Sequence, residues 1–294
     1  MKTDKSNPNG NFSGYLNGLI GVLLFSGSLP ATRLAVIDFS PGFLTASRGS
    51  IAGILALTVL LISRPKLPSG KQISSLIIVS LGVVVGYPLL SALALQHISS
   101  AHSIIFVGLL PLSTAAFAVL RGGERPKPLF WFFSVLGSLL VIGYALFQGI
   151  SGSYIGDLLM LAAIIVCGFG YAEGAEISKT LGGLQVISWA LVLAMPAMIA
   201  FSWFSFPSTL ITVHIGAWIS LGYVALFSSL IAFIFWYKGL AQGGTATVGQ
   251  LQLLQPFFGL ALAALLLDEQ VNAGMIIVVL GVILCVACSK RYAR

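Results

Sequence analysis

Three glutamines lie close together in one long apolar segment of this sequence. Gln252 and Gln255 are three residues apart, so on a helix they share one face, whereas Gln250 points elsewhere. A side-chain amide in an apolar environment is costly unless it faces protein or water. We therefore expect Gln252 and Gln255 to face a polar cavity and bind a solute, in preference to hydrogen bonding between helices. For Gln250 we favour the hydrogen bond between helices.

Charged side chains inside apolar segments are a second source of chemistry. Arg33 lies close to a helix end, where it either attracts an anionic group of a solute, such as a carboxylate, or has a structural role, extending toward the membrane surface or pairing with Asp38. Both interpretations remain open, and Arg33 is kept as a candidate binding residue. Arg48 lies about two turns into its segment. For this residue we favour a structural pair with Asp38.

Two groups are candidates for exchanging a proton or binding a cation. Glu173 lies deeper in its apolar segment than Glu176, which is spaced to pair with Lys179 on a helix surface. His102 begins another apolar segment. A lone histidine there usually forms hydrogen bonds at a helix end, and a proton relay is the alternative.

A solute cavity also needs apolar walls with hydroxyl groups beside them. The candidates for these walls are Phe25, Ser28, Tyr87, Ser91, Phe106, Tyr171 and Ser228. For the aromatic residues, lipid contact is the alternative, and we favour the cavity for the deeper Tyr87 and Tyr171. Trp236 and Tyr237 lie beside Lys238, so we expect them in the aromatic belt at the membrane surface.

Patterns typical of catalysis are missing from the sequence. It contains no H-E-x-x-H, no G-x-S-x-G and no paired catalytic aspartates, and its three histidines are scattered. Cys285 and Cys288 form a C-x-x-C inside an apolar run, without a partner pair or a histidine motif. We therefore expect no enzyme activity, no catalytic residue, no metal and no cofactor.

The composition requires these residues to be positioned inside a membrane. The chain is 57% hydrophobic and only 8% charged, with a mean hydropathy of +1.02. A soluble domain carries about 25% charged residues, so this chain cannot form a water-exposed surface of the usual kind. Its apolar runs are continuous and long enough to cross a bilayer as helices, without the alternation of a barrel strand. The predicted fold class is an all-α integral membrane protein.

Breaks in hydropathy divide the chain into ten expected transmembrane helices. Their ranges are 15–37, 42–62, 73–95, 99–120, 128–147, 156–176, 185–205, 215–237, 245–266 and 272–289. With the N-terminus in the cytoplasm, every lysine and arginine outside the spans falls in a cytoplasmic segment. The net charge of +7 then lies beside anionic lipid at the inner face, so we expect no nucleic-acid partner.

The chain also contains an internal repeat. Pro111 and Glu124, with the apolar run between them, recur 145 residues later as Pro256 and Glu269. Five spans per half is an odd number, so the second half enters the membrane upside down relative to the first. The expected organisation is two inverted five-helix repeats, 14–150 and 151–290, between short cytoplasmic segments, 1–13 and 291–294. Because they repeat in register, Pro111 and Pro256 are expected to bend their helices.

These features resemble the drug/metabolite transporter superfamily, in its ten-span EamA-type branch. The resemblance covers nearly the whole chain. The stretches that carry it are the repeated proline-to-glutamate pattern, the run from Phe25 to Arg33, the start of the second span at 48–52, the start of the second half at 156–159, and 221–229 in the eighth span. It implies that spans 1, 3, 4, 6, 8 and 9 surround the cavity. Relatives often have an acid where this chain has Gln255, so the resemblance does not extend to proton coupling at that position.

The function implied is secondary transport of a small amphipathic organic solute, such as an amino acid or related metabolite. An inverted repeat typically places the solute at the interface of its halves and works by alternating access. The resemblance alone implies the outward direction. A translocator of lipids or lipid-linked precursors on the same fold is the alternative, and an intramembrane enzyme is a weaker one. We expect a multi-pass protein of the plasma membrane, the inner membrane in a bacterium, in contact with lipid and with both termini cytoplasmic. A proton or other coupling ion and the oligomeric state remain open.

Overall fold

The protein is all-helical in the parts that the computed structural model describes, residues 8–123, 125–147, 153–207, 213–267 and 273–292. Within these parts, a helix or a broken helix lies in each of the ten ranges that were expected to be transmembrane, so the helical class is confirmed, whereas the number of ten spans stays a prediction. The repeated Glu124 and Glu269 lie outside the described residues, as do residues 1–7 and 293–294 of the expected terminal segments.

The helices follow the chain in two series. The first series is α1 (Pro8–Ser26), α2 (Ser28–Asp38), α3 (Pro41–Ser63), α4 (Gly70–Val79), α5 (Tyr87–Ala94), α6 (Ser100–Val107), α7 (Leu110–Gly122) and α8 (Pro128–Phe147). The second series is α9 (Tyr154–Leu181), α10 (Gly183–Phe204), α11 (Ile215–Tyr223), α12 (Ala232–Gly243), α13 (Thr245–Gly249), α14 (Gln255–Leu267) and α15 (Ala273–Tyr292).

Besides the turn at Gly27 that separates α1 from α2, four spans of the described residues change their helical geometry part-way. A π-helical segment, Ser80–Gly86, joins α4 to α5, and another, Val224–Ile231, joins α11 to α12. Residues 108–109 interrupt the span between α6 and α7, and a 3₁₀ segment, Gln250–Leu254, joins α13 to α14. A displacement of 145 residues maps the first π segment into the second, and maps the interruption into the 3₁₀ segment. The irregular turns therefore recur in register.

A proline closely follows three of these four irregular turns, the second π segment being the exception. Proline has no N–H to donate, and Pro88 follows the first π segment while Pro111 and Pro256 begin the regular helices after the other two breaks. Backbone carbonyls at these turns bond to side chains: Ser138 Oγ donates to the Gly108 carbonyl at 2.8 Å, and Ser229 Oγ donates to the Val224 carbonyl at 2.9 Å. Hydroxyl groups inside the protein thus satisfy backbone groups that lipid cannot.

Six helical segments of the described residues are long and apolar enough to cross a membrane. They are Phe12–Asp38, Pro41–Ser63, Gly70–Ala94, Tyr154–Leu181, Gly183–Phe204 and Ile215–Gly243. Shorter apolar helices occur at Leu110–Arg121, Pro128–Leu140 and Leu280–Ser289. The chain is therefore a multi-pass membrane protein.

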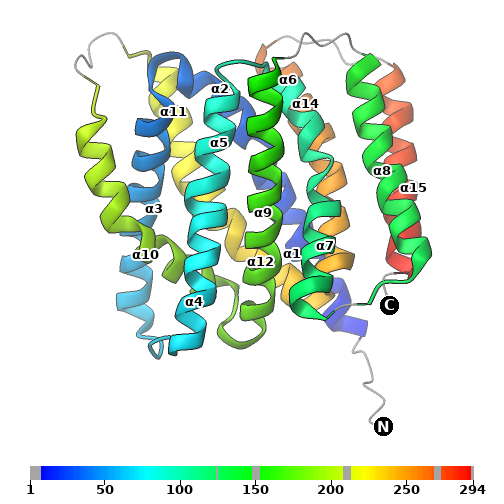
Figure 1. The fold of residues 1–294 in the computed structure, drawn as a ribbon, viewed down its shortest axis with the longest axis horizontal. Coiled ribbons are helices and arrows are strands. Elements are labelled where there is room, and N and C mark those ends of the chain that lie inside the picture. Colours follow the sequence, from blue (N-terminus) through cyan, green and yellow to red (C-terminus); the bar gives the residue numbers. More distant parts are fainter. Residues whose placement is uncertain (1–7, 124, 148–152, 208–212, 268–272, 293–294) are drawn as a thin grey trace.

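The helices pack in recurring pairs. In Figure 1, α3 lies beside α10 at one edge of the bundle, α8 lies beside α15 at the other, and α9 runs through the middle. The pairs α1 with α12 and α5 with α9 are also in close contact. Glycine permits this approach: a Cβ built on Gly82 would lie 2.7 Å from the Val166 carbonyl oxygen of α9, and one on Gly239 would lie 2.6 Å from the Gly18 nitrogen of α1.

The largest buried side chains correct one expectation. Trp236 and Tyr237 are completely buried, so their predicted position in an aromatic belt is wrong. Their rings pack against Tyr171 of α9, with centroid distances of 5.5 Å and 6.4 Å. Neighbouring helical residues point about 100° apart. The exposed Lys238 therefore gave no information about the side chains just before it.

Candidate functional site

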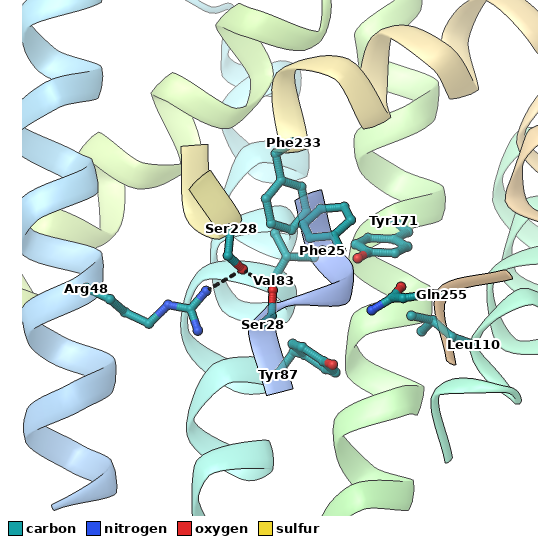
Figure 2. A pocket seen from close by; sticks show the side chains of 10 residues that line it. All are labelled: Phe25, Ser28, Arg48, Val83, Tyr87, Leu110, Tyr171, Ser228, Phe233 and Gln255. Carbon is teal, nitrogen blue, oxygen red and sulfur yellow. Dashed lines mark hydrogen bonds between the residues drawn. The ribbon is translucent and has the colours of Figure 1, made fainter. Parts of the chain in front are cut away.

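A buried cavity forms where the irregular turns of both halves of the chain converge. Its lining, shown in Figure 2, consists of Phe25, Ser28, Arg48, Val83, Tyr87, Leu110, Tyr171, Ser228, Phe233 and Gln255. Val83 and Ser228 lie in the two π segments, Leu110 follows the interruption at 108–109, and Gln255 follows the 3₁₀ segment. The breaks in the helices thus place side chains from distant parts of the chain around one space.

The cavity is closed in this conformation. Its volume is about 20 Å³, close to what one water molecule needs. An organic solute can enter only if the surrounding helices move apart.

One wall of the cavity is formed by Arg48, Ser28 and Ser228, and Ser229 joins them by a hydrogen bond without lining the cavity itself. Arg48 Nη2 donates to Ser228 Oγ at 3.1 Å, and Arg48 Nε donates to Ser229 Oγ at 2.9 Å. Ser28 Oγ donates to Ser228 Oγ at 2.7 Å, which ties α2 to the second π segment. We call Arg48, Ser28, Ser228 and Ser229 the arginine–serine cluster. All four side chains are buried.

The expected pair between Arg48 and Asp38 does not form. Asp38 instead accepts a hydrogen bond from the backbone N–H of His214 at 2.8 Å, and its carboxylate lies 3.1 Å from the His214 ring nitrogen Nδ1. Ion pairing cannot be assigned from the sequence of one helix, because the partner depends on how that helix is rotated against its neighbours.

The opposite wall is aromatic. The Phe25 and Phe233 rings pack edge to face with centroids 4.8 Å apart, and the Phe25 and Tyr171 rings stack at 6.3 Å. Figure 2 shows these rings together, with Tyr87 on the other side of Ser28. Such rings provide apolar contact area for a solute and, in Tyr87 and Tyr171, hydroxyl groups.

The three glutamines occupy different environments. Gln255 lines the cavity. Gln252 lies one turn away along the chain, is completely buried, and has no hydrogen-bond partner for either amide atom within the described structure. Gln250 Nε2 donates to Ser134 Oγ at 3.0 Å, so the expected hydrogen bond between helices is confirmed. Gln252 and Gln255 share a helix face, but three residues also separate them by about 5–6 Å along the helix axis. This displacement keeps Gln252 out of the cavity lining.

Several expected site residues lie outside the cavity lining. Arg33 donates to the Leu95 carbonyl, and Ser91 donates to the Pro88 carbonyl at 3.2 Å. Phe106 stacks on His102, with a centroid distance of 5.9 Å. These contacts shape spans 1, 3 and 4 and place none of the three side chains in the closed cavity.

Glu173 and His102, the candidate coupling groups, each form a polar contact with a residue of another span. Glu173 Oε2 accepts a hydrogen bond from Arg121 Nε at 2.8 Å, and the Glu173 side chain is 7% exposed. His102 Nε2 lies 2.7 Å from Asp157 Oδ1, at the start of α9. The surface pair expected between Glu176 and Lys179 is present, at 2.5 Å.

Sequence reasoning missed four residues that line the cavity. Arg48 was assigned to a structural pair, although its depth in an apolar segment was the available signal. Val83, Leu110 and Phe233 carried no signal, because an apolar residue facing a cavity has the same sequence pattern as one facing lipid. Among the described residues, no group of three histidine, cysteine or acidic side chains is placed to hold a metal ion.

Comparison with known proteins gives consistent matches. Residues 12–147 and again residues 154–289 match the EamA-like transporter family. A Bacillus subtilis protein named uncharacterized transporter YdeK is 60% identical over 96% of this chain and 98% of its own length. An Escherichia coli protein named uncharacterized inner membrane transporter YedA is 28% identical over 68% of this chain and 65% of its own length.

Two further matches are more distant. A Chlamydia muridarum protein named S-adenosylmethionine/S-adenosylhomocysteine transporter is 26% identical over 88% of this chain and 86% of its own length. A protein of known crystal structure is similar in fold, with a TM-score of 0.75 and 19% identity over 95% of this chain and 98% of its own. This last likeness concerns the fold alone.

Proposed function

We propose a function for this chain from the premise that it belongs to the EamA-like transporter family. The proposed function is secondary transport of a small amphipathic organic solute, such as an amino acid or a related metabolite. The solute binds in the cavity between the arginine–serine cluster and the aromatic wall. The proposed direction is outward, and it rests on the family resemblance.

The observation that carries this proposal is the convergence of irregular helical turns on one buried polar cavity. Transporters place their solutes where broken helices meet near the membrane midplane, because unwound backbone is tolerated there and the halves can move. Here the π segments contribute Val83 and Ser228, and the breaks before α7 and α14 contribute Leu110 and Gln255. These turns recur in register in the two halves of the chain.

The proposed architecture is ten spans in two inverted five-helix repeats, 14–150 and 151–290. The helix pairs support it. A two-fold relation between the halves exchanges spans 1 and 6, 2 and 7, and so on. Such a relation would map the pairs α3 with α10 and α8 with α15 onto themselves and exchange α1–α12 with α5–α9. All four of these pairs are in contact, which supports the proposal. In Figure 1, α1 begins and α15 ends at the same end of the bundle, which supports the proposal that both termini lie in the cytoplasm.

The proposed mechanism is alternating access. The closed cavity opens to one side of the membrane at a time as the two halves move against each other. A solute or a coupling ion can drive this cycle only if it binds the two open states of the protein with different affinities. Glu173 and His102 are the proposed coupling groups, since each joins the first half of the chain to α9 in the second.

Counterflow in proteoliposomes tests the function. Purified protein is reconstituted with a panel of amino acids, nucleosides, polyamines and S-adenosylmethionine, with and without a pH gradient. We expect saturable exchange of an amphipathic solute. If the protein exchanges no member of the panel but moves labelled lipid between leaflets, a lipid translocator replaces the proposal.

Accessibility of tags at both chain ends, in intact cells and inverted vesicles, tests the topology. Both tags are expected to react only from the cytoplasmic side. Tags that react from opposite sides would show an odd number of spans and contradict the inverted repeat.

A further inference from the structure

Arg48 is a deeply buried cation without an acidic partner in the described structure. It is the eighth residue of α3, about 10 Å along the helix from its start at 1.5 Å per residue. Its relative exposure is 6%, and none of the ion pairs between described residues includes it. A buried charge that is not neutralised costs several kcal/mol, so such residues in membrane proteins usually serve a function.

Extension toward the membrane surface does not explain Arg48. A side chain that reaches for the surface leaves the protein and becomes exposed at the end of its helix. The Arg48 guanidinium instead points into the bundle, toward Ser228 and Ser28, as Figure 2 shows. The direction of the side chain therefore indicates a partner inside the cavity.

The serines satisfy hydrogen bonds of Arg48 but not its charge. A guanidinium has five N–H donors, and the two serine hydroxyls that accept from it are neutral. Hydroxyl groups can rotate, so Ser28 and Ser228 are able to donate to an anion once the cavity opens. The planar guanidinium fits a carboxylate with two parallel hydrogen bonds.

We propose that Arg48 binds the carboxylate of the transported solute, so that the substrates are amphipathic carboxylates. This inference rests on the proposed transport function and names its substrate class. The arginine–serine cluster holds the carboxylate. The apolar body of the solute packs on Phe25, Tyr171 and Phe233, and Gln255, whose buried Oε1 has no partner within the described structure, binds a second polar group.

Charge balance also favours a carboxylate over other kinds of charged solute. The cavity lining contains one cation and no acidic residue. A single carboxylate neutralises that cation. A phosphate monoester would leave excess negative charge in the cavity, and a polyamine would place like charges together. An amino acid qualifies because its ammonium group can meet the Gln255 carbonyl and the aromatic faces.

Matched pairs of acids and amides test the proposal. Counterflow in proteoliposomes is measured for L-leucine, L-methionine, L-phenylalanine and indole-3-acetate, each against its primary amide, with spermidine as a cationic probe. The wild type is expected to exchange at least one acid about tenfold or more faster than its amide, which corresponds to about 1.4 kcal/mol. In Arg48→Gln this ratio is expected to fall close to one, and Arg48→Lys is expected to keep part of it.

Arg33→Gln is the matched control, because Arg33 is also an intramembrane arginine but donates to the Leu95 carbonyl outside the cavity. It is expected to keep the wild-type ratio. If Arg48→Gln does not fold, the acid-to-amide ratio of Arg48→Lys is compared with that of the wild type, and an unchanged ratio overturns the role of Arg48.

Each failure has its own meaning. Exchange of amides or spermidine as fast as the acids, or an unchanged ratio in folded Arg48→Gln, overturns the carboxylate proposal and leaves the transport function standing. A wild type that exchanges no solute in either panel overturns the transport function and this inference with it.

Discussion

Arg121 donates from Nε to Oε2 of Glu173 across 2.8 Å, and the two residues belong to different halves of the chain. Arg121 ends α7, and Glu173 lies in α9. His102 and Asp157 connect the same two spans at the opposite end of α9. Each pair therefore crosses the boundary along which the proposed halves move. We expect each pair to lengthen when the cavity opens toward its own side of the membrane.

Replacement of Glu173 by glutamine is expected to slow counterflow about fivefold or more while membrane insertion stays intact, because a partly exposed ion pair contributes about 1 kcal/mol. Proteoliposome exchange and protein yield measure the two effects. The double variant Glu173→Gln/Arg121→Gln distinguishes a structural role of Glu173 from a coupling role. Recovery of exchange would show that the ion pair only holds the two helices together, and would contradict coupling through Glu173. Glu176→Gln, in the exposed pair with Lys179, is the control and is expected to behave as wild type.

Gln252 does not line the small cavity of this conformation, and we expect its unpartnered amide to contact the solute only when the cavity opens. Replacement of Gln252 by leucine is therefore expected to slow transport without lowering stability. Both amide atoms of Gln252 are buried without a partner in the described structure, and such a group costs about 1–3 kcal/mol, which the apolar side chain removes. Thermal unfolding in detergent and counterflow are measured together. Gln250→Leu should show the opposite pattern, with a lower Tm, because it breaks the bond to Ser134. Unchanged transport by Gln252→Leu would show that Gln252 does not contact the solute in the open states either.

Replacement of Ser228 by alanine is expected to weaken solute affinity about tenfold or more, since a hydrogen bond to a charged group contributes about 1.5–3 kcal/mol. Ser228 accepts from both Arg48 and Ser28 at the cavity. The KM for counterflow is the measurement. Ser47→Ala removes another serine pair, 2.7 Å from Ser202 between α3 and α10, and is expected to leave KM unchanged. Equal effects in the two variants would contradict a special role for Ser228.

Replacement of Gly82 by alanine is expected to destabilise the protein by about 1–3 kcal/mol, because overpacking forces backbones apart. The added Cβ would lie 2.7 Å from the Val166 carbonyl oxygen and 3.1 Å from the Gly170 Cα. Thermal unfolding in detergent measures the loss. Gly222→Ala, in the corresponding span of the other half, meets nothing within 4 Å and should leave the Tm unchanged. A Tm equal to wild type for Gly82→Ala would show that α9 does not pack so closely on this segment.

Much of the fold follows from hydropathy and from the turn-forming residues between the apolar runs. The all-helical membrane class and the family were predicted and are confirmed. Helices lie in all ten predicted ranges, and six candidate spans of the described residues are long and apolar enough to cross a membrane. The in-register prolines marked the breaks before α7 and α14. The inverted arrangement of the two halves stays a prediction, to be tested by the tags at the chain ends.

Part of the candidate site was also predictable. Phe25, Ser28, Tyr87, Tyr171, Ser228 and Gln255 were expected at a cavity and line it, whereas their roles in binding remain predictions. Gln252, Ser91, Phe106 and Arg33 lie elsewhere, although their residue types are as suitable. A polar side chain within a span is expected to face away from lipid. Hydrogen bonds to protein and a polar cavity both meet this requirement, so polarity alone does not distinguish them.

The sequence by itself determined which ranges are helical, that Pro111 and Pro256 disturb two of the spans, and that lipid surrounds the helices, because these depend on neighbouring residues and on composition. Only the tertiary structure decided that Arg48 meets Ser228 and Ser229 while Asp38 meets His214, and that Trp236 and Tyr237 are buried. The physical reason is that lipid tails are as apolar as a protein core. Hydropathy therefore does not fix how a transmembrane helix is rotated, and close packing between distant spans must do so.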